Sequence, residues 1–423
     1  MVYFTDVFNV AIQYFICYCR RCICFSLCGT NALAAINIAY PIVSILTGIA
    51  LMFAAGGSAI AALSIGCGRI KQAQKEFSVC VIISMITGIL ISAVIFLFLP
   101  QILVFLGATD LTVKDCKIYA AIWLIGVPAV IGKELFTYFI RVDGSPTYSF
   151  FIAVAGGIVN IILDYIFIGC MNMGVLGAGL ATILGLIISF ALGIIYFIKR
   201  KKHLHFTFTD VSLKSGLRCA TNGFSQFIDQ AAIAITTVVF NRTALSLAGE
   251  NGIAAVTIIM YLQYIFIGIY FGYSMGISPL LSYAYGDEKK PICKKLEGYC
   301  YRFFAISLLF IYVIIYISAP LVVSFFAKSG TEVYAMAVSG MRIYGLGFLF
   351  SGFNIFTAIR LTSYGKGQLS AIVTFLRSFV LLLIFLITLP ILWKMNGLWL
   401  AMPLAEAVTI FVSLVIAFST RIR

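Results

Sequence analysis

The sequence predicts an all-α protein that crosses a membrane about twelve times and is built from two six-helix repeats. Three observations support this prediction. Hydrophobic residues make up 62% of the chain and charged residues only 10%, whereas soluble proteins carry about 25% charged residues. Apolar stretches recur along the whole chain, and about 20 such residues are enough to cross a hydrocarbon core roughly 30 Å thick. The first half also resembles the second in sequence.

The predicted spans follow one another with short connections. Several exceed the length that a bilayer requires, so we expect them to tilt or to extend into water. The first span is atypical because it contains the segment CYCRRCICFSLC, residues 17–28. The predicted spans lie near residues 1–28, 33–66, 77–99, 117–140, 148–170, 174–198, 215–245, 252–285, 298–326, 334–359, 369–393 and 397–420.

Basic residues gather in alternate loops, and this asymmetry predicts the orientation. Loops rich in lysine and arginine face the cytoplasm, so we expect a multi-pass protein of the cell membrane with both termini cytoplasmic. The net charge of +14 therefore reflects topology, and we expect no binding of nucleic acid. The basic set comprises Arg69, Lys71, Lys75, Arg141, Lys199 to Lys202, Lys289, Lys290, Lys294, Lys295, Lys366, Arg421 and Arg423; the opposite loops carry only Lys114, Lys117, Lys328 and Lys394.

An internal repeat divides the chain into halves of the same orientation. Residues 29–66 align without a gap with residues 249–286, and a weaker match joins FTYFIR (136–141) to FTAIR (356–360). We predict an N-lobe (1–198), a cytoplasmic linker (199–213) and a C-lobe (214–423). Transporters built from such repeats bind substrate between the halves and alternate its access. Recurring small residues at helix interfaces are the alternative explanation, which the gap-free match disfavours. Identical pairs include Gly29/Gly249, Asn31/Asn251, Gly48/Gly268, Gly56/Gly276, Ser58/Ser278 and Gly66/Gly286.

One carboxylate, Asp164, lies inside the apolar run 151–170. A charge at the bilayer centre costs roughly 2.5–3.5 kcal/mol, so it usually faces a cavity or a partner. Asn160 lies four residues earlier on the same helix face, and Thr182 lies at a similar depth in the next span. Because burial raises the pKa of a carboxyl group, this cluster suits a proton or a small cation. The alternative is a purely structural hydrogen bond.

Other polar residues at depth are candidates for the lining of a cavity. Gln226, Asp229 and Gln230 share one face of the seventh span, and the cost of burying charge applies equally to Asp229. Lys133, by contrast, is expected to extend its ammonium group to water. The full set of these candidates is Gln226, Asp229, Gln230, Gln263, Asn354, Glu406 and Glu134.

The motifs of common enzymes are missing. The sequence contains neither GxxxxGK[ST] nor HExxH, so we expect no ATP-driven transport and no enzymatic activity. Most of the twelve cysteines stand singly in apolar runs, where cysteine behaves as a small hydrophobic residue. We therefore expect no metal site and no cofactor, and an ion gradient of protons or sodium as the energy source.

Several motifs together resemble the multidrug and toxic compound extrusion (MATE) family. They are LAAINIAYPI (33–42), GGSA (56–59), IRVDGSP (140–146), NIILDYIFI (160–168) and MGVLGAGLAT (173–182). The resemblance implies twelve helices in two lobes, and a monomer that exports small organic compounds, typically cationic, in exchange for protons or sodium. Asn160, Asp164 and Thr182 match the N-lobe polar cluster of the prokaryotic proton-coupled branch. The C-lobe acidic site of sodium-coupled members has no clear match, and Asp229 is the nearest candidate.

One segment departs from the family pattern. Family members carry an aspartate in the first helix, where this chain has Arg20 and Arg21, and we interpret this as an altered N-terminal segment. One alternative is therefore a chain that inserts without transporting. A second is a lipid-linked oligosaccharide flippase of the same superfamily, which the placement of the basic residues in loops disfavours. An intramembrane enzyme would need a nucleophile–base pair or a metal set, and the sequence offers neither.

Overall fold

The structure is a computed structural model that describes residues 35–199, 202–207 and 212–420, and every regular element in these residues is helical. The first predicted span, with Arg20 and Arg21, lies outside them. A helix from Ala35 to Gly66 comes first. It is followed by α2 (Ile70–Leu97), α3 (Leu99–Phe105), α4 (Val113–Ile125), α5 (Val127–Val142), α6 (Pro146–Asp164), the π-helix η1 (Tyr165–Cys170), α7 (Gly174–Lys199), α8 (Leu213–Gly286), α9 (Lys290–Ser324), α10 (Glu332–Tyr344), the 3-10 turn η2 (Gly345–Gly347), α11 (Phe348–Ser363), α12 (Gly367–Phe375), the π-helix η3 (Leu376–Val380) and α13 (Leu381–Ser419).

The helices confirm the predicted all-α, polytopic membrane fold. Within the described residues eight helices are long and apolar enough to span a membrane, or nine if the pair α4 and α5, bent by 51°, counts as one span. Two long helices also contain a break in the helical backbone, at Ala248–Gly249 in α8 and at Trp393–Lys394 in α13. The break in α8 divides it into two membrane-length arms, and the break in α13 separates a span made of α12, η3 and the first part of α13 from a span made of the rest of α13. The nine spans therefore correspond to eleven crossings, which match the predicted spans from the second onward.

Helix ends differ from the predicted spans at the basic loops. Helix α2 begins at Ile70 and α9 at Lys290, whereas the apolar runs begin near residues 77 and 298. Backbone hydrogen bonding continues beyond the bilayer into these polar turns, because an apolar run marks the part of a helix in lipid and not the ends of the helix.

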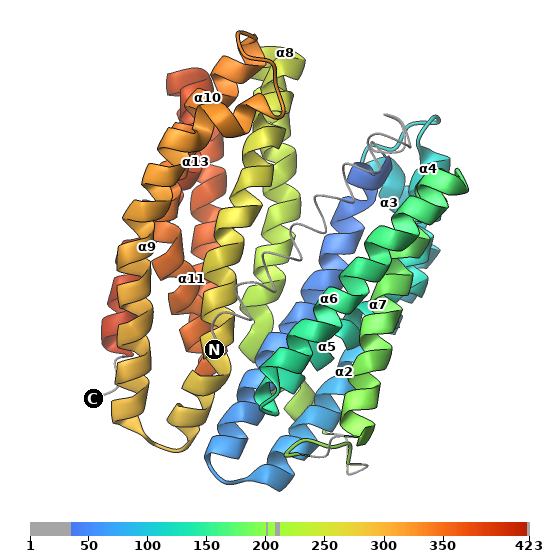
Figure 1. Cartoon of the computed structure of the whole chain (residues 1–423), viewed down its shortest axis with the longest axis vertical. Coiled ribbons are helices and arrows are strands. Elements are labelled where there is room, and N and C mark those ends of the chain that lie inside the picture. The colour runs from blue at the N-terminus through green and yellow to red at the C-terminus, as the bar shows by residue number, and fades with distance from the viewer. Residues whose placement is uncertain (1–34, 200–201, 208–211, 421–423) are drawn as a thin grey trace.

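The described helices form two groups (Figure 1). Helix Ala35–Gly66 and α2–α7 form the first group, and α8–α13 form the second. The groups lie close together at one end of the molecule and farther apart at the other. The close end contains the turns 66–70 and 286–290, and its loops carry the basic residues that follow both copies of the repeat. We refer to it as the basic end.

At the basic end the two repeat copies contact one another reciprocally. A Cβ atom on Gly66 would lie 2.4 Å from the carbonyl oxygen of Tyr283, and one on Gly286 would lie 2.3 Å from the carbonyl oxygen of Leu63. Leu63 and Tyr283 are themselves 220 residues apart, which is the offset of the sequence repeat. The ends of the two helices therefore pack as an approximately two-fold pair, and only glycine permits this approach.

A second contact between the groups lies deeper in the molecule, and we call it the glycine contact. A Cβ on Gly56 would lie 2.5 Å from the amide nitrogen of Gly223. The side-chain amide of Asn222 donates a hydrogen bond to the carbonyl of Gly56 (3.2 Å), and the hydroxyl of Tyr283 donates one to the carbonyl of Val142 (2.5 Å). Close packing and hydrogen bonds thus hold the groups together on the side of the basic end.

Candidate functional site

A cavity of about 290 Å³ lies between the two helix groups. In the first group, helix Ala35–Gly66 and α5 contribute lining residues. In the second group, the lining residues come from α8, α10, η3 and α13. Its volume is at the lower end of the range of about 300–1,000 Å³ that is usual for ligand pockets. Of the polar candidates from the sequence, those that line it are Glu134, Gln226, Asp229, Gln230, Gln263 and Glu406.

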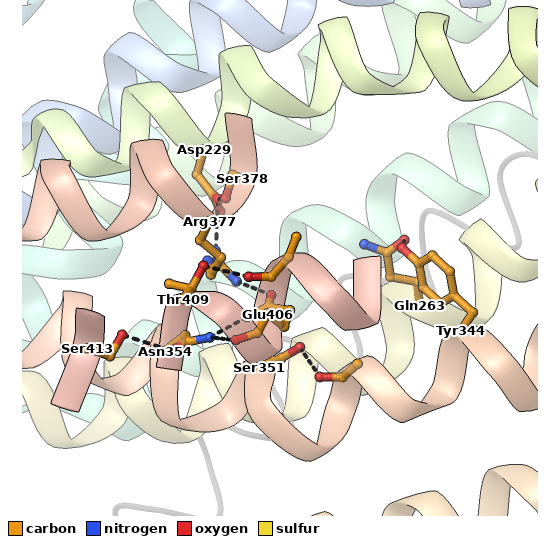
Figure 2. A network of polar contacts seen from close by, with 12 residues as sticks. Asp229, Gln263, Tyr344, Ser351, Asn354, Arg377, Ser378, Glu406, Thr409 and Ser413 are labelled. Atoms are coloured by element: carbon orange, nitrogen blue, oxygen red, sulfur yellow. Dashed lines mark hydrogen bonds and ion pairs between the residues drawn. The ribbon is translucent and has the colours of Figure 1, made fainter. Parts of the chain in front are cut away.

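An ionic network occupies the wall that the second group contributes (Figure 2). Arg377 of η3 lies between two carboxylates on different helices: its Nη2 is 2.9 Å from Oδ1 of Asp229 on α8, and its Nη1 is 3.1 Å from Oε1 of Glu406 on α13. The hydroxyl of Ser378 donates a further bond of 2.6 Å to Oδ1 of Asp229. A guanidinium group is suited to this role because its donors are fixed in one plane.

Asn354 does not line the cavity but holds Glu406 in place. It is fully buried on α11, and its side-chain amide donates to the Glu406 carboxylate (2.7 Å) and to the Glu406 carbonyl (2.9 Å). The hydroxyl of Ser413 donates to the Asn354 oxygen (2.7 Å). The Glu406 side chain is only 5% exposed, so these bonds fix its position in the wall. A separate pair, Tyr344 and Gln263, is joined by a hydrogen bond.

Arg377 is not among the candidate residues selected from the sequence. The signal was present, because this residue is a single charge inside the apolar run 369–393 and the cost of burying charge applies to it as much as to Asp164. Its surroundings in the helix are also unusual, since η3 is a π-helical segment. Such segments are rare and occur frequently at functional sites.

The pair Lys133 and Glu134 brings charge to the cavity from the first group. Their side chains are 10% and 16% exposed, and Lys133 Nζ lies 2.7 Å from Oε1 of Glu134. The expectation that Lys133 reaches water is therefore wrong, because the adjacent carboxylate satisfies the ammonium group within the protein. Arg141 also lines the cavity, with its guanidinium 4.8 Å from the centre of the Tyr138 ring.

The residues Asn160, Asp164 and Thr182 lie elsewhere, in α6 and α7. Asn160 and Asp164 are buried, and Asp164 is the last residue of α6 before η1. Helix α7 packs closely here, since a Cβ on Gly185 would lie 3.1 Å from the Cβ of Asn160. The half-buried Thr182 donates its hydroxyl to the carbonyl of Ala178 on its own helix (2.7 Å). None of the three is among the described residues that line the cavity, and their role in ion coupling stays a prediction.

Comparison with known families identifies the fold. The MatE family model matches residues 7–166 and 226–388, which together are more than half of the chain. The chain belongs to the MATE family. Members of this family are membrane transporters and not enzymes, and they need no cofactor.

Curated relatives of this MATE protein match it over most of its length. It is 24% identical over 387 residues to the multidrug export protein MepA of Staphylococcus saprophyticus, covering 88% of this chain and 80% of the relative. It is likewise 24% identical over 406 residues to the MepA of Staphylococcus haemolyticus, covering 93% and 87%.

Solved MATE structures share the fold. A MATE transporter in complex with MaL6 superposes with a TM-score of 0.93 at 21% identity, covering 99% of this chain and 94% of the other. A transporter of the MOP superfamily from Pyrococcus furiosus gives a TM-score of 0.90, again at 21% identity, covering 99% and 95%.

Proposed function

We propose that this MATE protein exports amphipathic organic cations across the cell membrane in exchange for protons or sodium ions. The observation that carries the proposal is the cavity between the helix groups, which combines carboxylates with an apolar lining. Aromatic and methionine side chains such as Phe240, Phe271, Met260 and Met275 contribute to that lining. Flat apolar cations suit such walls, because aromatic faces attract positive charge. The relatives named multidrug export proteins support the same class of substrate.

Alternating access follows from the arrangement of the two groups. We infer that they correspond to lobes 1–198 and 214–423, joined by the linker 199–213, and that the chain works as a monomer. The positive-inside rule places the basic end in the cytoplasm. The reciprocal contact of Gly66 and Gly286 and the glycine contact then close the cytoplasmic side, so we assign this structure to the outward-facing state. Transport would require these contacts to open and the opposite ends of the groups to approach.

We place the coupling ion at Asp164, with Asn160 and Thr182 as neighbouring oxygen donors. Support comes from the burial of Asp164 on α6 and from the close packing of α6 on α7. An ion there would drive export if it binds one of the two states more tightly, because the ion and the substrate are then linked through the same equilibrium.

A lipid-linked oligosaccharide flippase of the same superfamily is the alternative. Such a protein would need a strongly basic cavity for an anionic headgroup. Here the cavity is lined by three acidic residues, Glu134, Asp229 and Glu406, and by two basic ones, Arg141 and Arg377. This balance favours a cationic substrate.

The test is efflux of a fluorescent organic cation from drug-sensitive cells under an imposed proton or sodium gradient. We expect gradient-driven efflux by the wild-type protein and its loss in Asp164→Asn. Asp110→Asn is the matched control, because it makes the same chemical change at an exposed position in a loop. Efflux that survives in Asp164→Asn would remove the proposed ion site. No efflux by a wild-type protein shown to be in the membrane would contradict the exporter itself.

A further inference from the structure

The carboxylates of the cavity already have cationic partners within the chain. Glu134 is paired with Lys133 at 2.7 Å, and Arg377 contacts both Asp229 and Glu406. An organic cation that enters the cavity therefore meets acidic groups that are already engaged. Binding of an organic cation to one of these carboxylates therefore requires an internal ion pair to break.

The geometry singles out the contact between Arg377 and Asp229. The side chain of Asp229 is 26% exposed, whereas that of Glu406 is 5% exposed and is also held by Asn354. The Arg377 side chain is itself 10% exposed and lines the cavity. The Glu406 side of the network is thus anchored in the wall, and the Asp229 side is open to a ligand.

The net charge of the network also favours binding of a cation. Two carboxylates face one guanidinium, so the three side chains together carry one negative charge when all are ionised. The two carboxylates come from α8 and α13, and Arg377 comes from η3 between them. Two carboxylates that lie close together repel each other, and a cation bound between them favours their ionised forms. Here a side chain of the protein takes the place of that cation.

We propose that Arg377 is a tethered cation that competes with the substrate for Asp229 and thereby sets the selectivity of the cavity among cations. When a substrate binds, Arg377 keeps its contact with Glu406 and gives up Asp229. Weakly interacting monovalent cations are then excluded, and those that add apolar and aromatic contacts are favoured. This inference rests on the proposed function, because it assumes that the cavity binds the exported cation.

The prediction is a gain of affinity when the competitor is removed. Replacing Arg377 by glutamine keeps a planar hydrogen-bonding side chain but removes the charge, and leaves Asp229 and Glu406 without a cation. We expect Arg377→Gln to bind a permanent monovalent cation about tenfold more tightly, as charge-assisted contacts of this kind allow. Arg377→Lys keeps the charge and should restore affinity close to that of the wild type.

The experiment measures equilibrium binding of tetraphenylphosphonium to the purified full-length protein and its variants in detergent. Triphenylphosphine oxide, which has a similar shape and no net charge, is the control ligand, and its affinity should not change. The double variant Asp229→Asn, Arg377→Gln should lose the gain, because the exposed carboxylate is then absent. Thermal unfolding of each variant shows whether it is folded.

The outcomes separate this inference from the proposed function. Tighter binding of tetraphenylphosphonium to Arg377→Gln, absent in the double variant, supports the competition. Equal or weaker binding to a folded Arg377→Gln overturns it while leaving the exporter in place. No saturable binding to the wild type overturns both. Should Arg377→Gln fail to fold, Arg377→Met decides. Competition predicts that this variant binds tetraphenylphosphonium more tightly and triphenylphosphine oxide with unchanged affinity, and equal or weaker binding of tetraphenylphosphonium to the folded variant overturns it.

Discussion

The glycine contact gives a prediction whose size follows from the structure. A Cβ atom on Gly223 would lie 1.9 Å from the carbonyl oxygen of Met52 and 2.7 Å from the amide nitrogen of Gly56. Cβ atoms essentially never approach other atoms within 3.0 Å, so the helices must separate by about 1.1 Å, the difference between 3.0 and 1.9 Å. Overpacking of this kind costs about 1–3 kcal/mol. In Gly223→Ala the two-state equilibrium should therefore shift by about 5–150-fold toward opening of the cytoplasmic side.

The assay uses Cys219, which is 1% exposed and whose carbonyl oxygen would lie 2.1 Å from a Cβ on Gly56. A maleimide is added to inside-out membrane vesicles, and its adduct with Cys219 is quantified over time by mass spectrometry of the peptide. Labelling should be faster in Gly223→Ala by the factor above. Gly298→Ala is the matched control, since a Cβ there has no neighbour within 4 Å. An unchanged rate in a folded Gly223→Ala would refute the assignment of this contact as the closed gate.

Two further predictions concern buried polar contacts that stabilise the helices and the linker. Glu297→Gln leaves the buried guanidinium of Arg360 without the carboxylate that now lies 2.7 Å from it; the loss should cost about 3–5 kcal/mol, seen as a lower thermal unfolding midpoint, while Glu250→Gln at an exposed site should not change it. Asp143 accepts bonds from the backbone amides of His203 and Leu204, both at 2.9 Å. Asp143→Asn should weaken this anchor of the linker and speed tryptic cleavage at residues 199–202, and an unchanged cleavage rate would contradict the anchoring role.

The membrane spans could be predicted from the sequence because each must satisfy its backbone hydrogen bonds internally and present apolar side chains to lipid. Neither requirement depends on neighbouring helices, so composition alone is informative. The breaks at Gly249 and Lys394 fall where the sequence predicts connections between spans, at 245–252 and 393–397. The two π-helical segments among the described residues were not predictable in the same way. They arise where packing between helices decides the local backbone, and a single sequence carries little record of that packing.

In the candidate site, too, the sequence indicates individual residues but not the contacts between helices. The repeat indicated that Gly66 and Gly286 are equivalent, but it did not indicate that their helices contact each other. Arg377 was recognisable as a charge in an apolar run. Its partners were not, because Asp229 is 148 residues away and Glu406 is 29 residues away, and no local spacing rule connects residues at such separations.

The central claim is that the cavity between the helix groups holds the exported compound. The most direct measurement is photolabelling of the protein in membranes with a diazirine derivative of tetraphenylphosphonium, followed by mapping of the adducts by mass spectrometry. The account predicts adducts on cavity residues such as Met260, Met275 and Met402, suppressed by an excess of unlabelled compound. Adducts confined to exposed outer positions such as Ile306 and Phe310 on α9, or adducts that an excess of compound does not suppress, would contradict it.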